Sequence, residues 1–149
     1  MNRLISCLLL AAAPLLSLSS YAQQKLVPAQ SEIVFVSKQM GVPVEGRFKK
    51  FDAQISFDST KLATSKVSFT VDIGSATLGA PEADAELPKP AWFNVAKFPQ
   101  ATFTSSAIKA QGAGKFEVAG KLVIKGQSRD VTVPVTMVQA GALTTASGS

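Results

Sequence analysis

Hydrophobic and polar residues alternate along several segments of the chain. In residues 66–73, every second position is apolar (Val67, Phe69, Val71 and Ile73), and polar residues lie between them. The same period recurs in three more segments, with the apolar sets Phe51, Ala53, Ile55 and Phe57, then Phe116, Val118, Gly120, Leu122 and Ile124, then Val131, Val133, Val135 and Met137. Because side chains alternate between the two faces of a strand, each set is expected on one face of a β-sheet.

Residues 31–38 and 101–108 are predicted to form two further strands. In the second, the alternation slips near Ser105 and Ser106, which indicates a β-bulge. Turn-forming residues at 58–60 and 125–128 separate the strands. Pro134 has no N–H to donate, so its strand should lie at a sheet edge, at a bulge, or be only partly paired.

One stretch has the pattern of a helix. Pro81 suits a first-turn position, and Pro88 ends the helix. The segment between them carries Glu82, Asp84 and Glu86, which favour a helix N-terminus. We interpret these acidic residues as helix-stabilising in preference to metal-binding. The sequence therefore predicts an all-β fold with one short helical insertion.

Residues 1–22 have the layout of a secretory signal peptide. Arg3 gives a basic start, residues 4–18 are almost entirely apolar, and Ser20 and Ala22 form a small-x-small cleavage site. The apolar run is short for a membrane span, so a retained anchor is the lesser alternative. We expect an exported protein whose mature chain begins at Gln23.

Composition narrows the function classes. The chain has a formal net charge of +5 and no histidine, and its single cysteine, Cys7, lies in the predicted signal peptide. Loss of Arg3 takes the charge to +4, which is too scattered for nucleic-acid binding but would favour contact with an anionic membrane surface. Without His or Cys, the commonest general base and the most reactive nucleophile are missing. We expect no enzyme, no cofactor and no metal site; a hydrolase built on carboxylates alone is the remaining catalytic alternative.

Six short stretches form a pattern that is specific in its order and spacing. They are residues 31–35, 44–51, 71–75, 92–99, 101–105 and 118–126. Over about residues 26–138 this pattern resembles the YceI-like family, the lipid- or polyisoprenoid-binding domains of bacterial periplasms. The resemblance implies a periplasmic, lipocalin-like antiparallel β-barrel over residues 23–149, whose interior holds a long isoprenoid chain.

The resemblance also raises an expectation about the C-terminal part of the barrel. The family normally continues well past the strand that ends near Val138, whereas this sequence stops at Ser149. We therefore expect a C-terminally truncated or shortened barrel. The strand over 131–137 would then present an open edge, and unpaired edges promote association between chains. Poor solubility or an edge-to-edge dimer is the expected result.

The expected ligand is a polyisoprenoid or an isoprenoid quinone, held in an apolar interior. Its candidate contacts are Phe35, Phe51, Ile55, Phe57, Phe69, Val71, Trp92, Phe93, Phe103, Phe116 and Leu122. Of these, Trp92 and Phe93 could cap one mouth together with Phe98. Arg47 and Lys49, next to Lys50, are the headgroup candidates.

Two alternatives stay open at this point. Alternation alone favours a dry, filled core, because every sheet needs an apolar face; the family resemblance favours a cavity instead. For function, the alternative to lipid binding is a ligand-free module that interacts with envelope proteins under stress.

Overall fold

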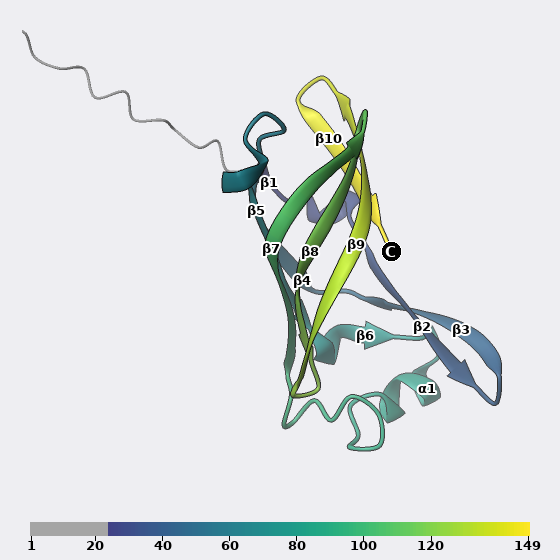
Figure 1. The fold of residues 1–149 in the computed structure, drawn as a ribbon. Coiled ribbons are helices and arrows are strands. Elements are labelled where there is room, and N and C mark those ends of the chain that lie inside the picture. Colours follow the sequence, from purple (N-terminus) through teal and green to yellow (C-terminus); the bar gives the residue numbers. More distant parts are fainter. Residues whose placement is uncertain (1–23) are drawn as a thin grey trace, which may run out of the picture.

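The computed structural model describes residues 24–149, which form mostly antiparallel strands (Figure 1). The strands are β1 (Gln24–Lys25), β2 (Ile33–Gln39), β3 (Val42–Phe48), β4 (Phe51–Ser56), β5 (Lys66–Asp72), β6 (Ala76–Thr77), β7 (Gln100–Gly112), β8 (Lys115–Ile124), β9 (Gln127–Ala140) and β10 (Leu143–Gly148). These residues also include the α-helix α1 (Pro81–Glu86) and the short 3-10 helices η1 (Pro28–Gln30), η2 (Leu62–Thr64) and η3 (Ile73–Ser75). The predicted signal peptide lies outside the described residues.

The strands form two sheets. Seven lie in the order β1-β4-β5-β7-β8-β9-β10, and a smaller sheet has the order β2-β3-β6. Figure 1 shows the larger sheet strongly curled, with the β2–β3 hairpin projecting from its lower half and α1 below β6. This curled antiparallel half-barrel confirms the predicted all-β, barrel-like fold class. No helix in the described part of the chain has the length and apolarity needed to cross a membrane.

The register of the larger sheet brings the predicted apolar stripes together on one face. Phe69 in β5 lies opposite Phe103 in β7, which lies opposite Leu122 in β8. A slip of one residue would turn a whole stripe to the other side, so the register and the pattern agree. We call this the inner face; on β4, β5, β7, β8 and β9 it comprises Phe51, Ala53, Ile55, Val67, Phe69, Val71, Ala101, Phe103, Ser105, Ile108, Ala110, Phe116, Val118, Gly120, Leu122, Ile124, Gln127, Arg129, Val131, Val133, Val135 and Met137. We include Phe57, the residue after β4, because its ring packs against Phe116 of this face.

The predicted bulge in β7 is confirmed. The β7–β8 register shifts between Ser105 and Ala107, so Ser105 and Ile108 lie on the same face although they are three positions apart. The hydroxyl of Ser105 accepts a hydrogen bond from the N–H of Val67 at 2.9 Å. The bulge therefore replaces a backbone acceptor in the β5–β7 ladder with a side-chain acceptor.

The expected open edge on β9 is wrong for the end of the strand, from Val135 onwards, whereas Val131 to Pro134 pair with β8 alone among the residues that the structure describes. β10 pairs with β9 from Leu143 opposite Ala140 to Gly148 opposite Val135, so the free edge passes to β10. Pro134 lies directly beyond that pairing. The N–H of Met137 donates to Gly114 on the β8 side, so by strand alternation the nitrogen of Pro134 faces the β10 side, where it has no hydrogen to donate. At Pro134, β9 therefore pairs with β8 on one side only. This agrees with the predicted alternative of a partly paired strand.

The β2–β3 hairpin contains a strand that the pattern does not predict. Gln39 lies opposite Val42, which leaves the two-residue turn Met40–Gly41, with φ of 51° and 83°. Left-handed backbone at both turn positions matches the twist of a hairpin. Pro43 and Gly46 weaken the strand signal in β3, because both residues are depleted in strands.

The helix α1 begins at Pro81 as predicted, but its acidic residues have separate roles. Asp84 turns back towards β6, where it accepts hydrogen bonds from the Thr77 hydroxyl at 2.5 Å and the Leu78 N–H at 2.6 Å. These bonds hold the pKa of Asp84 below its ordinary value, because they stabilise the charged carboxylate. Glu86 pairs with Lys89 after the helix. Asp84 therefore anchors α1 to β6.

Candidate functional site

The inner face carries two separate hydrophobic clusters. The lower cluster, near β6, has Phe48, Ile73 and Ala101 at its centre. The upper cluster, towards the β9–β10 turn, centres on Ile108, Phe116 and Val118. Each cluster draws residues from strands that are far apart in the sequence, so together they hold the curl of the sheet.

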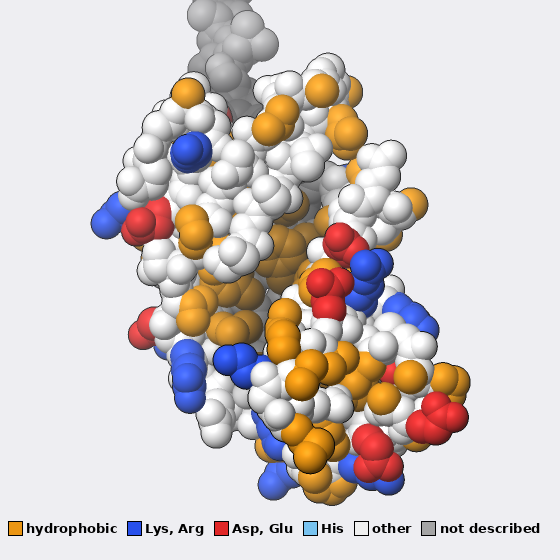
Figure 2. Space-filling view, turned by 90° about the vertical axis from the view of Figure 1, so that its right-hand side faces the viewer, with side chains coloured by type: hydrophobic (Ala, Val, Ile, Leu, Met, Phe, Trp, Pro, Cys, Tyr) orange, Lys and Arg blue, Asp and Glu red, His pale blue; other side chains and the backbone are white. Residues whose placement is uncertain are grey.

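Several large apolar side chains of the inner face stay in contact with solvent. Phe51, Phe57, Phe69 and Phe103 are only half-buried. Seen from the side that lies on the right in Figure 1, the surface is hollowed near its middle, and hydrophobic side chains line the hollow (Figure 2). The described residues therefore leave part of this apolar surface exposed to solvent.

A row of apolar residues crosses the inner face between the two cluster centres. It runs from Ala53 through Phe69 and Phe103 to Leu122, each opposite the next. The rings of Phe69 and Phe103 are 6.4 Å apart between centroids. Gly120 does not leave space here, because the ring of Phe103 lies over it.

Among the remaining inner-face candidates, Phe116 lies at the centre of the upper cluster, and Phe57 and Val71 each pack against one of the two clusters. Phe57 packs edge-on against Phe116, with ring centroids 5.1 Å apart, in the upper cluster. Val71 packs against the lower cluster. Phe51 lies opposite Val71, and Ile55 lies opposite Val67. The structure thus brings eight of the candidates onto one surface.

Phe35 and Phe93 form an aromatic group with Phe48. The ring centroids of Phe35 and Phe48 are 4.9 Å apart, and Phe93 stands edge-on to Phe35 at 5.5 Å. This group joins the small sheet to the loop after α1. Trp92 belongs to neither cluster, and Phe98 packs against Gly126 in the β8–β9 turn.

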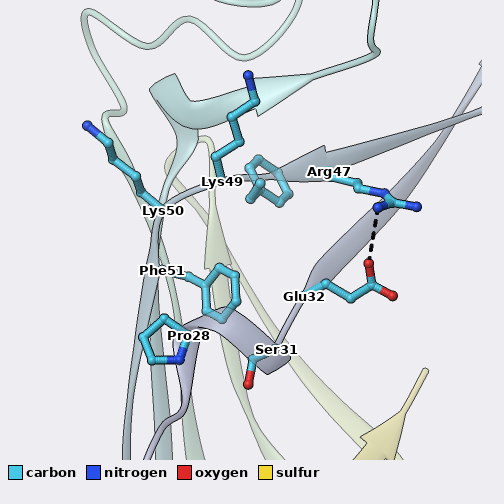
Figure 3. Close-up of a pocket in the computed structure, with 8 residues that line it drawn as sticks. Pro28, Ser31, Glu32, Arg47, Lys49, Lys50 and Phe51 are labelled. Atoms are coloured by element: carbon cyan, nitrogen blue, oxygen red, sulfur yellow. Dashed lines mark ion pairs between the residues drawn. The ribbon is translucent and has the colours of Figure 1, made fainter.

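The headgroup candidates line an open pocket of about 550 Å³ where the two sheets meet. Figure 3 shows Arg47, Lys49, Lys50 and Phe51 around it, with Glu32 beside Arg47. Arg47 lies 3.4 Å from a carboxylate oxygen of Glu32 and 3.6 Å from one of Glu45. Its charge is already balanced by two acidic neighbours.

The lysines of this pocket point away from its apolar floor. In Figure 3, the side chains of Lys49 and Lys50 extend upwards and diverge, whereas the ring of Phe51 faces the pocket. Their ammonium groups are therefore directed to solvent at the rim. The structure brings Arg47 and Lys49 near the apolar face but does not aim them along it.

The ligand contacts predicted from the sequence omit two residues that lie on or near the inner face. Phe48 is buried at the centre of the lower cluster, and the alternation of Val44, Gly46 and Phe48 against Glu45 and Arg47 is the signal that could have found it. Arg129 lies on the inner face opposite Leu122, and extension of the 131–137 stripe by one period would have reached it.

Chemical groups for catalysis are sparse on this surface. Within residues 24–149, no group of three or more His, Cys, Asp or Glu side chains gathers as a metal site would require. In the turn predicted at 58–60, the hydroxyl and the N–H of Thr60 donate hydrogen bonds to the carboxylate of Asp58. These bonds lower the pKa of Asp58. What the inner face offers is apolar contact.

Comparison with known proteins gives matches in sequence and in structure. Protein YceI of Salmonella arizonae is 35% identical over 96 residues, which are 64% of this chain and 50% of that protein. The chain thus spans about half the length of the curated relatives it matches. The crystal structure of BcnA from Burkholderia cenocepacia matches at a TM-score of 0.78 with 47% identity, covering 82% of this chain and 77% of the other.

A third match shares the fold at low sequence identity. A polyisoprenoid binding domain from Saccharophagus degradans aligns with a TM-score of 0.54 and 16% identity, covering 73% of this chain and 63% of that one. The model of the YceI-like domain matches residues 24–149, which is nearly all of the chain beyond the predicted signal peptide. The chain belongs to the YceI-like family.

Proposed function

We propose that this protein is a non-catalytic binding protein for an isoprenoid-type lipid, either a polyisoprenoid or an isoprenoid quinone. The observation that carries the proposal is the half-buried state of Phe51, Phe57, Phe69 and Phe103 on the inner face. Apolar surface left in water is a source of binding free energy for an apolar ligand. An isoprenoid chain offers no hydrogen bonds, so it requires apolar contacts and little else.

The magnitude of this effect is sufficient for binding. Burial contributes about 0.8 kcal/mol per CH₂, so each five-carbon unit adds roughly 3–4 kcal/mol before the costs of ordering are subtracted. A few units across the row from Ala53 to Leu122 would bind without a polar anchor. The shared fold of the polyisoprenoid binding domain of Saccharophagus degradans supports the choice of ligand class.

The test is organic extraction of the purified protein, followed by mass spectrometry. An isoprenoid that co-purifies in about molar proportion supports the proposal. A clean extract from well-folded protein would instead favour the ligand-free envelope module. Catalysis is tested separately: the purified protein should leave isoprenoid phosphates and esters unchanged on prolonged incubation.

The proposed location is the periplasm, reached by cleavage of the signal peptide after Ala22. The layout of residues 1–22 supports this proposal. Cell fractionation and N-terminal sequencing test it: the periplasmic form should begin at Gln23. An intact Met1 in the periplasmic fraction would refute the cleavage.

A further inference from the structure

Residues 80–98 form a segment whose backbone is bonded only to itself. We call it the α1 segment, because it consists of α1 and the loop that leads towards β7, below the larger sheet in Figure 1. Among residues 24–149, its backbone hydrogen bonds, such as those from Phe93 to Leu87 and from Val95 to Pro88, join two of its own residues. It belongs to neither sheet. The segment can therefore move without breaking a strand ladder.

Two polar links tie the α1 segment to its surroundings. The carboxylate of Asp84 accepts the hydrogen bonds from Thr77 and Leu78 described above, and the ammonium of Lys125 donates to the C=O of Pro90 at 3.3 Å. Within residues 24–149, the remaining ion pair of the segment, between its Glu and Lys side chains, is internal. Few polar bonds would therefore break if the segment moved outwards.

The two ends of the α1 segment differ in freedom. Gly79, immediately before it, has a φ of 81°, and no heavy atom lies within 4 Å of the position that a Cβ would take. At the other end, the N–H of Ile73 donates to the C=O of Pro99 at 3.0 Å and fixes the chain before β7. Because glycine adopts a wide range of backbone angles and nothing packs on this one, Gly79 can serve as a hinge.

The α1 segment covers the lower end of the inner face. Phe93 and Val95 pack against the lower cluster, which also contains the inner-face residues Val71, Ala101 and Ile124. An apolar chain that extends from the middle of the inner face to its lower end would contact the same residues. The segment and such a chain therefore compete for one apolar surface.

We propose that the α1 segment is a built-in competitor of the apolar ligand. In the closed state, Phe93 and Val95 cover the lower end of the inner face; a long chain that reaches this end displaces them, and the segment turns outwards about Gly79. A short chain lies across the row from Ala53 to Leu122 and leaves the segment closed. The inference rests on the proposed function and deepens it, because it makes the segment a determinant of ligand length.

Opening of the segment affects the binding of long chains alone. A ligand shifts an equilibrium between two states by no more than the difference in its affinity for them. A long chain gains contact with the lower cluster only in the open state, so the cost of opening lowers its apparent affinity. Loss of the bonds to Asp84 reduces that cost, and it should therefore favour the long chain and leave the short one unaffected.

The test measures the affinity of the delipidated full chain for two uncharged prenols, the short farnesol and the long solanesol, by partition from cyclodextrin. Asp84→Ala should raise the affinity for solanesol about tenfold, the scale of one charge-assisted hydrogen bond. The affinity for farnesol should stay within about twofold of wild type. Asp58→Ala is the matched control and should change neither affinity, because Asp58 accepts the same pair of bonds, from the hydroxyl and the N–H of Thr60, in the β4–β5 connection.

A covalent lock makes the opposite change. Thr77→Cys and Asp84→Cys, combined with Cys7→Ser to leave no other cysteine, place two thiols where the Thr77–Asp84 hydrogen bond now lies. With the thiols joined by a short, cleavable bifunctional reagent, the protein should bind farnesol as before. It should bind solanesol about tenfold more weakly than the same variant does after cleavage of the reagent. Both measurements use one sequence, so a loss of stability from the substitutions does not enter the comparison.

Trp92, the single tryptophan, lies in the α1 segment and gives a second readout. In wild type, its emission should shift when solanesol binds and stay unchanged when farnesol binds. If neither prenol binds, the proposed function itself fails. If farnesol binds but the lock leaves solanesol binding unchanged, or if Asp58→Ala and Asp84→Ala act alike, the competition is refuted while lipid binding stands.

Discussion

Phe35 and Gly46 lie directly opposite each other in the β2–β3 hairpin, and the ring of Phe35 covers the bare backbone of the glycine. A Cβ at position 46 would lie closer to that ring than any real contact allows. The missing side chain is what lets Phe35 lie flat against the small sheet and reach Phe48 and Phe93.

Gly46→Ala should therefore destabilise the fold by roughly 1–3 kcal/mol, the range for overpacking. The measurement is chemical denaturation followed by the fluorescence of Trp92, the single tryptophan. Gly74→Ala is the matched control, because a Cβ there would lie 3.2 Å from an Asp72 oxygen and 3.5 Å from Val95, well outside the overlap expected at Gly46. Equal midpoints for the two variants would show that Phe35 can move aside at little cost.

Phe69→Ala should weaken both stability and lipid retention. Phe69 lies mid-strand on the inner face and is half-buried, so we expect roughly 2 kcal/mol, below the range for fully buried phenylalanines. Thr70→Ala, exposed on the opposite face, should stay within about 0.5 kcal/mol. Urea unfolding and extraction of bound lipid measure the two effects. Equal losses in the two variants would mean that the faces have been assigned in reverse.

Asp84 should make stability depend on pH. Its pKa is lowered in the fold from an ordinary 3.8 by the bonds from Thr77 and Leu78. The stabilisation is thus present above the unfolded pKa and is lost as the pH falls through the folded one. Asp84→Asn should melt below wild type at pH 7, and the gap should close towards pH 2–3.

Glu82→Gln, in the same helix, serves as the control for that pH profile, because Glu82 is exposed and its side chain makes no hydrogen bond within residues 24–149. Its melting temperature should follow wild type at both pH values. A gap between Asp84→Asn and wild type that persists at pH 2 would contradict the assigned role of the carboxylate.

Among residues 24–149, no strand pairs with the outer edge of β10, and this 149-residue chain should self-associate through that edge. The N–H of Met137 points to β8, so the even-numbered residues of β9 direct their backbone groups to β10. Their partners Leu143, Thr145 and Ser147 direct their own backbone groups back to β9. The N–H of Ala146, between them, therefore points away from β9. Ala146→Pro should reduce dimer formation in sedimentation velocity without disturbing the β9–β10 pairing. Thr145→Pro, one position away, should destabilise β10 instead. Unchanged association in Ala146→Pro would exclude this edge as the contact.

The central strands could be predicted because each has one apolar and one polar face. The sequence does not state which residues pair across the strands. It does limit the choice, because a shift of one residue between the strands of Phe69, Phe103 and Leu122 would turn an apolar face to the solvent side. β10 escaped prediction because its exposed Thr, Ser, Ala and Gly residues bury no apolar face, so its pairing leaves no periodic signal. β3 escaped because Pro43 and Gly46 mask the alternation.

The binding candidates divide in the same way. Inner-face residues follow from alternation, so Phe69 and Phe116 could be named from the sequence. Trp92 could not be placed, because loop residues have no period. The role of Arg47 depended on Glu32 and Glu45, and a charge cluster in a sequence does not reveal which cations are already neutralised.

The separation of the two hydrophobic clusters implies two cooperative units within one fold. The β2–β3 hairpin packs on the lower cluster through Ile33, Phe35 and Phe48, and among the described residues it contributes nothing to the upper cluster. Amide hydrogens of the hairpin should therefore exchange by local opening while those of β8 and β9 wait for global unfolding. A long apolar molecule could enter through this local opening. Once it contacts both clusters, the hairpin and the larger sheet would unfold together in one cooperative step.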